Sequence, residues 1–514
     1  MPSTSTLAAR AEVVVVGSGT AGAVIAGRLA EAGQEVLLLE AGPDYGPRNS
    51  GRWPDDLLDA ATLAMASHDW GYSGQIHGRE IAFPRAKVLG GCSSHNAGAV
   101  VHGSRFDYDG WAALGNPGWS TNDLLPLFDK AWERLRVRRV GFDELTPFQA
   151  EFAGSLEAVG IPRVDDINDL DEVAGVAPYP LSVEPDGKRI TAPFAYLDHL
   201  RGEPNLTIVG DAEVERLLLE GSRATGVVVR HDGADVEVRA ERVVLSAGAY
   251  GSPAILLRSG IGAAPHLRAA GVQPVRELPG VGENLHDQPA LEFDYAGSRE
   301  LVELMSEYSS DRWRPDEQVI AKLPSHDCGE GFDLHIYALG GRNPYARESW
   351  RWTLAGVVVS PLSRGHVRLS GPHCADPLII DHGYLTDADG SDLERLVEAS
   401  LVSREAAAQP RFKELLGKEL VPGPDVEGED DLRDFARQAA VHYFHPAGSC
   451  KMGPASDPTA VVGADASVHG VEGAYVADAS IMPFVMSGNT NMPTTVIGEK
   501  VAELLSQRRL QAPD

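Results

Sequence analysis

The sequence is poor in cysteine and has no long apolar run. Its four cysteines, Cys92, Cys328, Cys374 and Cys450, form no Cys-x-x-Cys pair among 514 residues. They are too sparse for a disulfide framework, so we expect reduced thiols and a cytoplasmic location. No stretch of about 18 apolar residues is free of charge, which argues against a transmembrane helix. The first twelve residues contain no apolar core with a cleavage site, so we also expect no export signal.

Positive charge is also in short supply. The 45 lysines and arginines face 74 acidic residues, which gives a formal net charge of -29. Such a charge repels a phosphate backbone and an anionic membrane surface, so we expect neither nucleic acid nor a membrane as a partner. Histidines and carboxylates show no metal-ligand spacing, and no Gly-x-Ser-x-Gly nucleophile elbow occurs. We therefore expect no metal site and no serine hydrolase.

The length and the pattern of apolar residues predict two domains, because 514 residues exceed one ordinary core. Strand and helix signals in residues 12–40, 206–257 and 474–506 predict an α/β domain of the Rossmann type. This domain is expected to comprise residues 1–155, 196–290 and 440–514. Mixed strand and helix signals elsewhere predict an α+β second domain, residues 156–195 and 291–439. Residues 53–84 are weakly periodic and are interpreted as an extended covering segment.

A glycine-rich motif follows the first predicted strand. Gly17-Ser18-Gly19-Thr20-Ala21-Gly22 separates a β-branched run, residues 12–16, from a helical pattern, residues 20–32. This spacing directs helix N-terminal amides toward a pyrophosphate, and Gly22 allows close helix packing. Glu40 ends the next strand, where a carboxylate can accept hydrogen bonds from ribose hydroxyls. The motif therefore predicts a bound dinucleotide rather than a plain glycine turn, but does not distinguish FAD from NAD.

Further motifs carry a resemblance to a known family. They are Arg85 to Asn96, Gly248 to Gly262, Gly280 to Leu285, His445 to Gly448 and Asp478 to Pro483. Together they resemble the glucose-methanol-choline (GMC) oxidoreductases, and the similarity extends from Val13 to Glu499. In physical terms, Gly90 and Gly91 let the backbone approach a planar ring without a Cβ clash.

The resemblance implies the GMC fold: a Rossmann-type FAD-binding domain and an α+β substrate-binding domain. It implies FAD as the cofactor. The cofactor-binding residues expected from the glycine motif and the resemblance are Gly17, Gly19, Thr20, Ala21, Gly22, Glu40, Ala41, Arg85, Val88, Gly90, Gly91, Ser94, His95, Asn96, Ala97, Val214, Ala247, Gly248, Asp478, Ala479, Asn489 and Thr490.

Two residues are candidates for catalysis. His445 matches the catalytic histidine of the family, and a neutral imidazole can take a proton from an alcohol. Asn489 matches a second active-site position, which holds His or Asn in the family, and its amide can hold the substrate oxygen. A lone histidine is more often structural, and the surrounding motif is what favours catalysis at His445. His442 lacks this support and is interpreted as structural or pocket-lining.

The flavin motif most resembles that of the choline oxidases, in which the histidine that matches His95 is covalently bound to FAD. A covalent bond at His95 is therefore a hypothesis, and a noncovalent contact is the alternative. The expected substrate pocket contains Gln318, Tyr443 and Phe444. Gln318 is aligned with the glutamate that choline oxidases present to a trimethylammonium group, although Glu317 is adjacent. The aromatic pair favours a flat or apolar alcohol if it is not plain core.

The sequence thus predicts an FAD-dependent enzyme that oxidises a small-molecule alcohol to an aldehyde or ketone by hydride transfer to flavin N5. Oxygen is the expected electron acceptor, with hydrogen peroxide as product. A dehydrogenase that uses a quinone or carrier, and a hydroxynitrile lyase with non-redox FAD, remain the alternatives. A homodimer is the candidate assembly.

Overall fold

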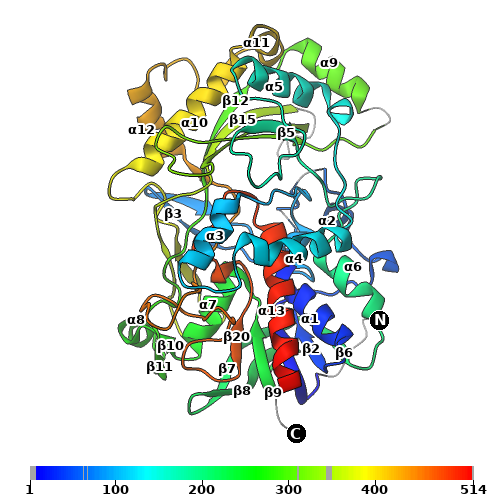
Figure 1. Cartoon of the computed structure of the whole chain (residues 1–514), viewed down its shortest axis with the longest axis vertical. Coiled ribbons are helices and arrows are strands. Elements are labelled where there is room, and N and C mark those ends of the chain that lie inside the picture. Colours follow the sequence, from blue (N-terminus) through cyan, green and yellow to red (C-terminus); the bar gives the residue numbers. More distant parts are fainter. Residues whose placement is uncertain (1–6, 62, 66, 310–311, 343–349, 512–514) are drawn as a thin grey trace.

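The computed structural model describes residues 7–61, 63–65, 67–309, 312–342 and 350–511. Within them, two seven-stranded sheets dominate the molecule and lie in its lower and upper halves in Figure 1. Each sheet packs against its own cluster of buried apolar residues. The chain is therefore organised around two cores, with the functional cavity between them.

The first sheet has a parallel centre. β1 (Arg10–Val16) lies between β2 (Val36–Leu39) and β9 (Ala234–Leu245) and is parallel to both. The sheet continues with β6 (Leu206–Val209) beside β2, β20 (Ala474–Val476) beside β9, and the antiparallel strands β8 (Arg223–His231) and β7 (Ala212–Glu220). Val13 to Val16 of β1 are all buried, as expected for a parallel strand covered on both faces.

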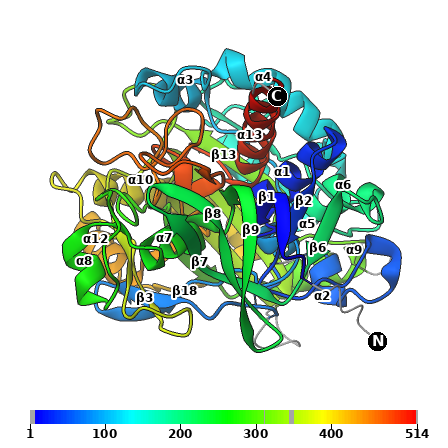
Figure 2. The same cartoon turned by 90° about the horizontal axis from the view of Figure 1, so that it is seen from below.

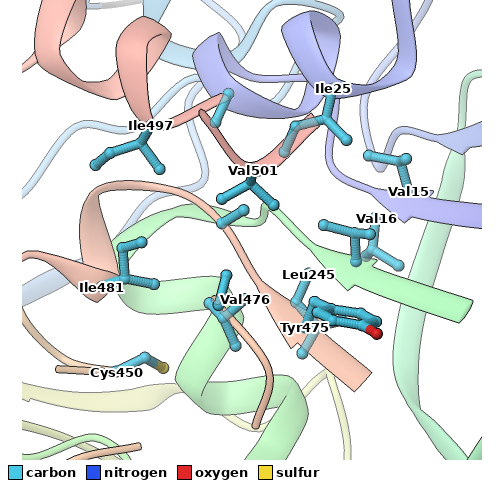
Figure 3. Packing of buried hydrophobic residues seen from close by; sticks show 14 of the residues in the cluster. Val15, Val16, Ile25, Leu245, Cys450, Tyr475, Val476, Ile481, Ile497 and Val501 are labelled. Atoms are coloured by element: carbon cyan, nitrogen blue, oxygen red, sulfur yellow. The ribbon is translucent and has the colours of Figure 1, made fainter. Parts of the chain in front are cut away.

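The first and last helices of the chain pack side by side on this sheet. α1 (Thr20–Glu31) contacts α13 (Asn491–Gln511), and Figure 2 shows the two helices over β1 and β2. Figure 3 shows the core beneath them, where Ile25 of α1 and Val501 of α13 approach Val16. The C-terminal segment therefore completes the first core.

The second sheet is antiparallel and follows the order β18 (Glu419–Val421), β12 (Pro289–Tyr295), β15 (Trp350–Val358), β14 (Leu334–Arg342), β13 (Val319–Leu323) and β5 (Gly175–Pro178). β19 (Val441–His442) also pairs with β12. At the top of Figure 1 lie α5 (Pro147–Ala158), α9 (Arg299–Tyr308), α10 (Ser391–Ala407), α11 (Pro410–Leu416) and α12 (Glu429–Ala439). Buried residues on the other side of the sheet, such as Tyr337 and Tyr443, are directed toward the first domain.

Shorter elements connect the two sheets. The described helices among them are α2 (Asp55–Leu58), α3 (Arg105–Ala113), α4 (Thr121–Arg134), α6 (Ala192–Tyr196), α7 (Gly248–Arg258), α8 (Ala264–Ala269) and the short 3₁₀ segments η1 (Arg48–Ser50), η2 (Gly91–Ser94), η3 (Phe142–Glu144), η4 (Asp198–Leu200) and η5 (Ala479–Ile481). The strands are β3 (Ser73–Ile76), β4 (Arg79–Ala82), β10 (Ile261–Gly262), β11 (Arg276–Glu277), β16 (His366–Leu369) and β17 (Leu378–Asp381).

The second sheet and its helices include segments that the sequence suggested for the first domain. Phe148 and Phe152 of α5 lie in the second core, so the chain enters that core before residue 155. β12 begins at Pro289, just before the expected boundary, and β19 adds residues 441–442 to the same sheet. These segments are short or weakly patterned, and only their tertiary partners show where they belong.

Candidate active site

A cavity of about 1050 Å³ is lined by strands and loops from both halves of the chain. This exceeds the roughly 300–1000 Å³ typical of small-molecule sites, so it has room for a large cofactor and a substrate. The cavity brings together these predicted cofactor residues: Gly17, Gly19, Thr20, Ala21, Glu40, Ala41, Arg85, Gly91, His95, Asn96, Ala97, Val214, Ala247, Gly248, Asp478, Ala479, Asn489 and Thr490. The predicted catalytic and aromatic residues His445, Tyr443 and Phe444 line it as well.

The first glycine loop fits closely between β1, β9 and α1. Gly17 has a φ of +89°, and a Cβ on it would stand 2.5 Å from the carbonyl oxygen of Ser246. A Cβ on Gly22 would collide with the carbonyl of Gly17, which is why α1 can begin so close to the loop. The first turn of α1 has no acidic residue and no side-chain cap. Its amides therefore point into the cavity, ready to bind an anion.

Glu40 lies beside this loop, at the end of β2. Its carboxylate accepts hydrogen bonds from the Ser18 amide at 3.0 Å, the Ser18 hydroxyl at 2.6 Å and the Gly42 amide at 2.8 Å. Burial raises the pKa of Glu40, and these hydrogen bonds act in the opposite direction. The carboxylate thus braces the glycine loop as well as lining the cavity, a role that the sequence did not indicate.

A second glycine turn meets the first. A Cβ on Gly91 would stand 2.9 Å from the Cα of Gly19. The Gly90 amide also donates to the Ser18 hydroxyl at 3.1 Å. Ser94 donates to the carbonyl of Leu89 at 2.9 Å, and Val88 is fully buried. Unlike Gly91, the residues Gly22, Val88, Gly90 and Ser94 do not line the cavity, and they shape the backbone behind it.

His95 ends this turn and faces the cavity. It is 6% exposed, and its Nε2 atom is buried without a hydrogen-bond partner. Burial, followed by the charge of Arg189, lowers the pKa of His95 to about 4. A hydrogen bond with the Ser67 backbone acts in the opposite direction. The imidazole of this cavity residue is therefore neutral near pH 7.

Asp478 organises another part of the wall. It accepts hydrogen bonds from the Gly248 amide at 2.9 Å, the Ser252 hydroxyl at 2.5 Å and the Ser480 amide at 2.8 Å. These bonds hold the start of α7 against η5. Ala247, Gly248 and Ala479 then present backbone to the cavity.

His445 and Asn489 come together from distant parts of the chain. The Nδ2 atom of Asn489 lies 3.4 Å from the Nε2 atom of His445, and the Nδ1 atom of His445 lies 2.5 Å from the Oε1 atom of Gln288. Burial lowers the pKa of His445 to about 3, and the charge of Arg85 and two other histidines add to the effect. The Oδ1 atom of Asn489 is buried without a partner. The neutral imidazole of His445 and the amide of Asn489 therefore lie side by side in the cavity wall.

Aromatic rings form the wall beside His445. The ring of Tyr443 stacks on Tyr337 at 5.2 Å between centroids and meets His445 edge-on at 4.7 Å. Phe444 has a φ of +66°, an unusual conformation for a bulky residue, and its ring packs on His442. The Nε2 atom of His442 lies 3.0 Å from the carbonyl oxygen of Ala82. Tyr443 and Phe444 thus belong to the cavity rather than to a plain core.

Gln318 differs from its expected place. It is 4% exposed, accepts a hydrogen bond from the Thr146 amide at 2.8 Å, and does not line the cavity. Its neighbour Glu317 lines the cavity instead. Successive side chains in an extended segment point to opposite sides, so a shift of one residue exchanges the two environments. The expectation for Gln318 is therefore corrected, and the acid beside it is the pocket residue.

Glu317 is a half-buried carboxylate. Within the described ranges no hydrogen bond or ion pair engages it. Burial, followed by the charge of Asp316, raises the pKa of Glu317 to about 8. On the same wall, the Glu292 carboxylate pairs with Arg351 at 2.6 Å, and Asp294 lies 3.8 Å from Arg351. Three carboxyl groups and one arginine thus line this part of the cavity.

Two further features of the described residues concern metal ligands and membrane-spanning helices. Among the residues that the structure describes, no group of three or more His, Cys, Asp or Glu side chains is arranged to hold a metal ion. In the same part of the chain, no helix has the length and apolar character needed to cross a membrane.

The residues of the cavity fit FAD. Two closely packed glycine turns line the cavity, the uncapped N-terminus of α1 suits a pyrophosphate, and His95 lies in the same wall. Together with the neutral base His445, these features define an FAD-dependent oxidoreductase. The chain belongs to the GMC oxidoreductase family, whose two models match residues 11–290 and 361–498. It is an enzyme that uses FAD to oxidise alcohols.

Several known proteins are similar over nearly the whole chain. An oxygen-dependent choline dehydrogenase of Chromohalobacter salexigens is 33% identical over 97% of this chain and 95% of its own length. The crystal structure of pyridoxine 4-oxidase from Mesorbium loti is 29% identical, with a TM-score of 0.84 and coverage of 98% and 100%. A formate oxidase structure, at 21% identity, has a TM-score of 0.84 and the same coverage, which supports the fold.

Sequence reasoning missed Asp287 and Gln288. Both are buried and both bond to His445, Asp287 through the His445 amide at 2.8 Å. Their one signal was position, since they lie two and three residues after Leu285, the end of the motif that begins at Gly280.

Proposed function

We propose that His445 is the base that removes the hydroxyl proton of the alcohol and that Asn489 positions the alcohol oxygen. The observation that carries this proposal is the 3.4 Å approach of Asn489 Nδ2 to His445 Nε2 at the cavity wall. Among the described residues Asn489 is the one partner of Nε2, and the low pKa of His445 keeps the ring neutral at neutral pH. Geometry and protonation state therefore suit a general base.

FAD supplies the hydride acceptor, the N5 atom of its ring system. The hydroxyl proton passes to His445 Nε2, the carbon-bound hydrogen leaves with its electron pair, and the alcohol becomes an aldehyde or ketone. Oxygen, which we propose as the final acceptor, takes up two electrons and two protons and leaves as hydrogen peroxide. The similar proteins include an oxygen-dependent choline dehydrogenase and pyridoxine 4-oxidase, and their names support oxygen, rather than a quinone or carrier, as the electron acceptor.

We further propose that the alcohol carries a positive charge. Glu317 is the supporting observation, because a half-buried carboxylate without a described partner is a costly feature that a cationic ligand would compensate. Glu292 and Asp294 outnumber Arg351 nearby, so the local field also favours a cation. The similar choline dehydrogenase acts, by its name, on such an alcohol.

Finer points belong to the same proposal. The two sheets mark an FAD-binding and a substrate-binding domain, with α5 in the latter. The enzyme works in the cytoplasm, where its four cysteines stay reduced. A homodimer is the proposed assembly.

Anaerobic titration with a panel of alcohols tests the function. The panel pairs quaternary ammonium alcohols with neutral tert-butyl isosteres and includes an aryl alcohol. We expect the ammonium alcohols to bleach the flavin absorbance fastest, and oxygen to restore it with one hydrogen peroxide per turnover. Restoration by a quinone but not by oxygen would identify a dehydrogenase. Cleavage of a hydroxynitrile without any bleaching would identify a lyase and refute the redox function.

A further inference from the structure

Gln288 lies between the two candidate catalytic residues. It directly precedes β12 and is fully buried. Its Oε1 atom lies 2.5 Å from His445 Nδ1. Its Nε2 atom donates to the carbonyl oxygens of Val359 at 2.9 Å and Met486 at 3.0 Å, and lies 3.3 Å from that of Gly488. One side chain thus bonds to the His445 ring and to the loop that carries Asn489.

The orientation of this amide follows from its surroundings. Three carbonyl oxygens surround one end of the Gln288 amide, and a carbonyl can only accept. The NH₂ group must therefore occupy that end, because a reversed amide would place four oxygens together. The Oε1 atom must face His445, and it can only accept as well.

We propose that Gln288 is a positioning residue that fixes His445 in the tautomer with a hydrogen on Nδ1 and none on Nε2. This inference rests on the proposed function of His445 as a base. An imidazole in the other tautomer would carry its hydrogen on Nε2, where it could not accept a proton from the alcohol. Gln288 thereby selects the one neutral form of His445 that is competent as a base.

The neighbours of Gln288 hold the same two loops. Asp287 accepts the His445 amide through Oδ1, and its Oδ2 atom accepts the Tyr384 hydroxyl at 2.9 Å. His286 accepts the Val485 amide at its Nε2 atom, at 2.6 Å. Three consecutive residues therefore join the His445 loop to residues 485–488. The position of His445 relative to Asn489 is set by backbone contacts as well as by Gln288.

A neutral partner also suits the charge around His445. The groups that face the ring are Arg85, His335, His442, Asp287 and Tyr443, and the first three disfavour a second positive charge. A carboxylate in place of Gln288 would accept from Nδ1 equally well but would stabilise the imidazolium. With an amide, orientation is provided without raising the pKa of His445. Gln288 thus sets the tautomer and leaves in place the low pKa that burial and Arg85 produce.

Nitrogen NMR of the holoenzyme with ¹⁵N-labelled histidine tests the tautomer directly. We expect one ring, absent from the spectrum of His445→Gln, with Nδ1 protonated and Nε2 unprotonated from pH 5 to 8. A His445 signal with hydrogen on Nε2 would overturn the proposal. This readout needs no turnover and no substrate.

Two substitutions test the consequence for the reaction. Gln288→Glu should keep FAD. The pH profile of its rate of flavin reduction should gain an acidic limb, whose midpoint lies at least one pH unit above that of any limb in the wild-type profile. Gln288→Leu should slow reduction by up to about a hundredfold, the effect of a misplaced reacting group. Gln149 provides the matched control, since it is fully buried and its amide donates to two carbonyls in the second core. Gln149→Glu and Gln149→Leu should leave the pH profile unchanged.

The outcomes separate this inference from the proposed function. If His445→Ala reduces flavin at the wild-type rate, His445 is not the base, and the NMR result still decides the tautomer. If His445→Ala is impaired but Gln288→Glu gives the wild-type pH profile and NMR spectrum, the role of Gln288 is refuted and the base is retained.

Discussion

Gly19 and Gly91 meet with no side chain between them, and a Cβ on Gly91 would stand 2.9 Å from the Cα of Gly19. Gly19 caps α1, and Gly91 begins η2, the turn that leads to His95. The two turns that face the cofactor are thus held at a distance that requires glycine at position 91, whereas a Cβ on Gly19 would stand 3.9 Å from the Cα of Gly91. This contact couples the dinucleotide loop to the flavin segment.

Gly91→Ala should therefore lower FAD content. The new methyl group must push the two turns apart, and the φ of +50° adds about 1–2 kcal/mol of backbone strain. Gly51→Ala is the control, because Gly51 has a φ of +69° and open space around its Cβ position. Flavin absorbance per protein after gel filtration measures the effect. A Gly91→Ala protein with full FAD would show that the contact is dispensable.

His445→Ala should bind FAD normally and reduce it at least about a hundredfold more slowly, the usual scale of general-base catalysis. In the wild type, the rate of flavin reduction should show no pH dependence from the titration of His445 between pH 5 and 8. The neutral form is the active one, and a pKa of about 3 keeps it populated throughout that range. Stopped-flow reduction under anaerobic conditions measures both effects. Near wild-type reduction in the variant would remove His445 from the mechanism.

Asn489→Ala should keep FAD and lose rate, by roughly tenfold to a hundredfold, because orientation is lost while the base remains. Asn489→His, which supplies a hydrogen-bonding side chain of the kind found in the family, should retain more rate than the alanine variant. Single-turnover kinetics on both proteins gives the comparison. Loss of FAD from Asn489→Ala would assign the residue a structural role instead.

We predict that FAD is covalently bound to His95. The imidazole lines the cavity and is neutral near pH 7, so a nitrogen lone pair is available to bond to the 8α carbon of FAD. The new bond would replace an 8α C–H bond, and oxygen would take up the two electrons released. We predict that flavin colour stays with acid-precipitated protein and that the intact mass includes FAD. His95→Ala should release the colour into the supernatant. If wild-type protein has the mass of the bare polypeptide, His95 makes only a noncovalent contact.

Glu317→Gln should raise KM for a quaternary ammonium alcohol and leave KM for its neutral isostere unchanged. In the wild type the carboxyl ionises as the pH rises toward its pKa of about 8, so KM for the cation should fall between pH 7 and 8, by up to about tenfold. The variant should lose this dependence. Glu241→Gln, which removes an exposed carboxylate paired with Arg10 away from the cavity wall, is the control. Equal KM changes for cation and isostere would argue against charge recognition.

Much of the first domain was predictable from its pattern. The strand signals in residues 12–40 and 206–257 correspond to β1 and β2 and to β6, β7, β8 and β9. Apolar strands and glycine motifs carry local signals, which explains this agreement. β13 is different, because its fourth residue is Lys322, fully buried and donating to two backbone carbonyls. A lysine at that position gives no strand signal until its partners are known.

The residues of the site were predictable where they belong to a sequence motif. The prediction failed where the direction of a side chain in an extended segment determines which residue lines the cavity. The glycine turns and His445 lie in continuous motifs, and both turns and His445 contribute residues to the cavity wall. Gln318 and Glu317 differ by one position, and the sequence had no means to tell which side chain points inward. Gln288 acts through a contact across 157 residues of sequence. No local pattern records such a contact.

The packing of α13 on α1 has a consequence for biosynthesis. The cavity takes residues from both ends of the chain, from Gly17 to Thr494. On the ribosome, at about 5–20 residues per second, the glycine loop therefore emerges roughly half a minute or more before its last partners. Until then the nascent first sheet lacks β20 and the helix that covers β1. The cavity can close only after residue 494 has emerged, so FAD is expected to bind after the start of α13 has been synthesised.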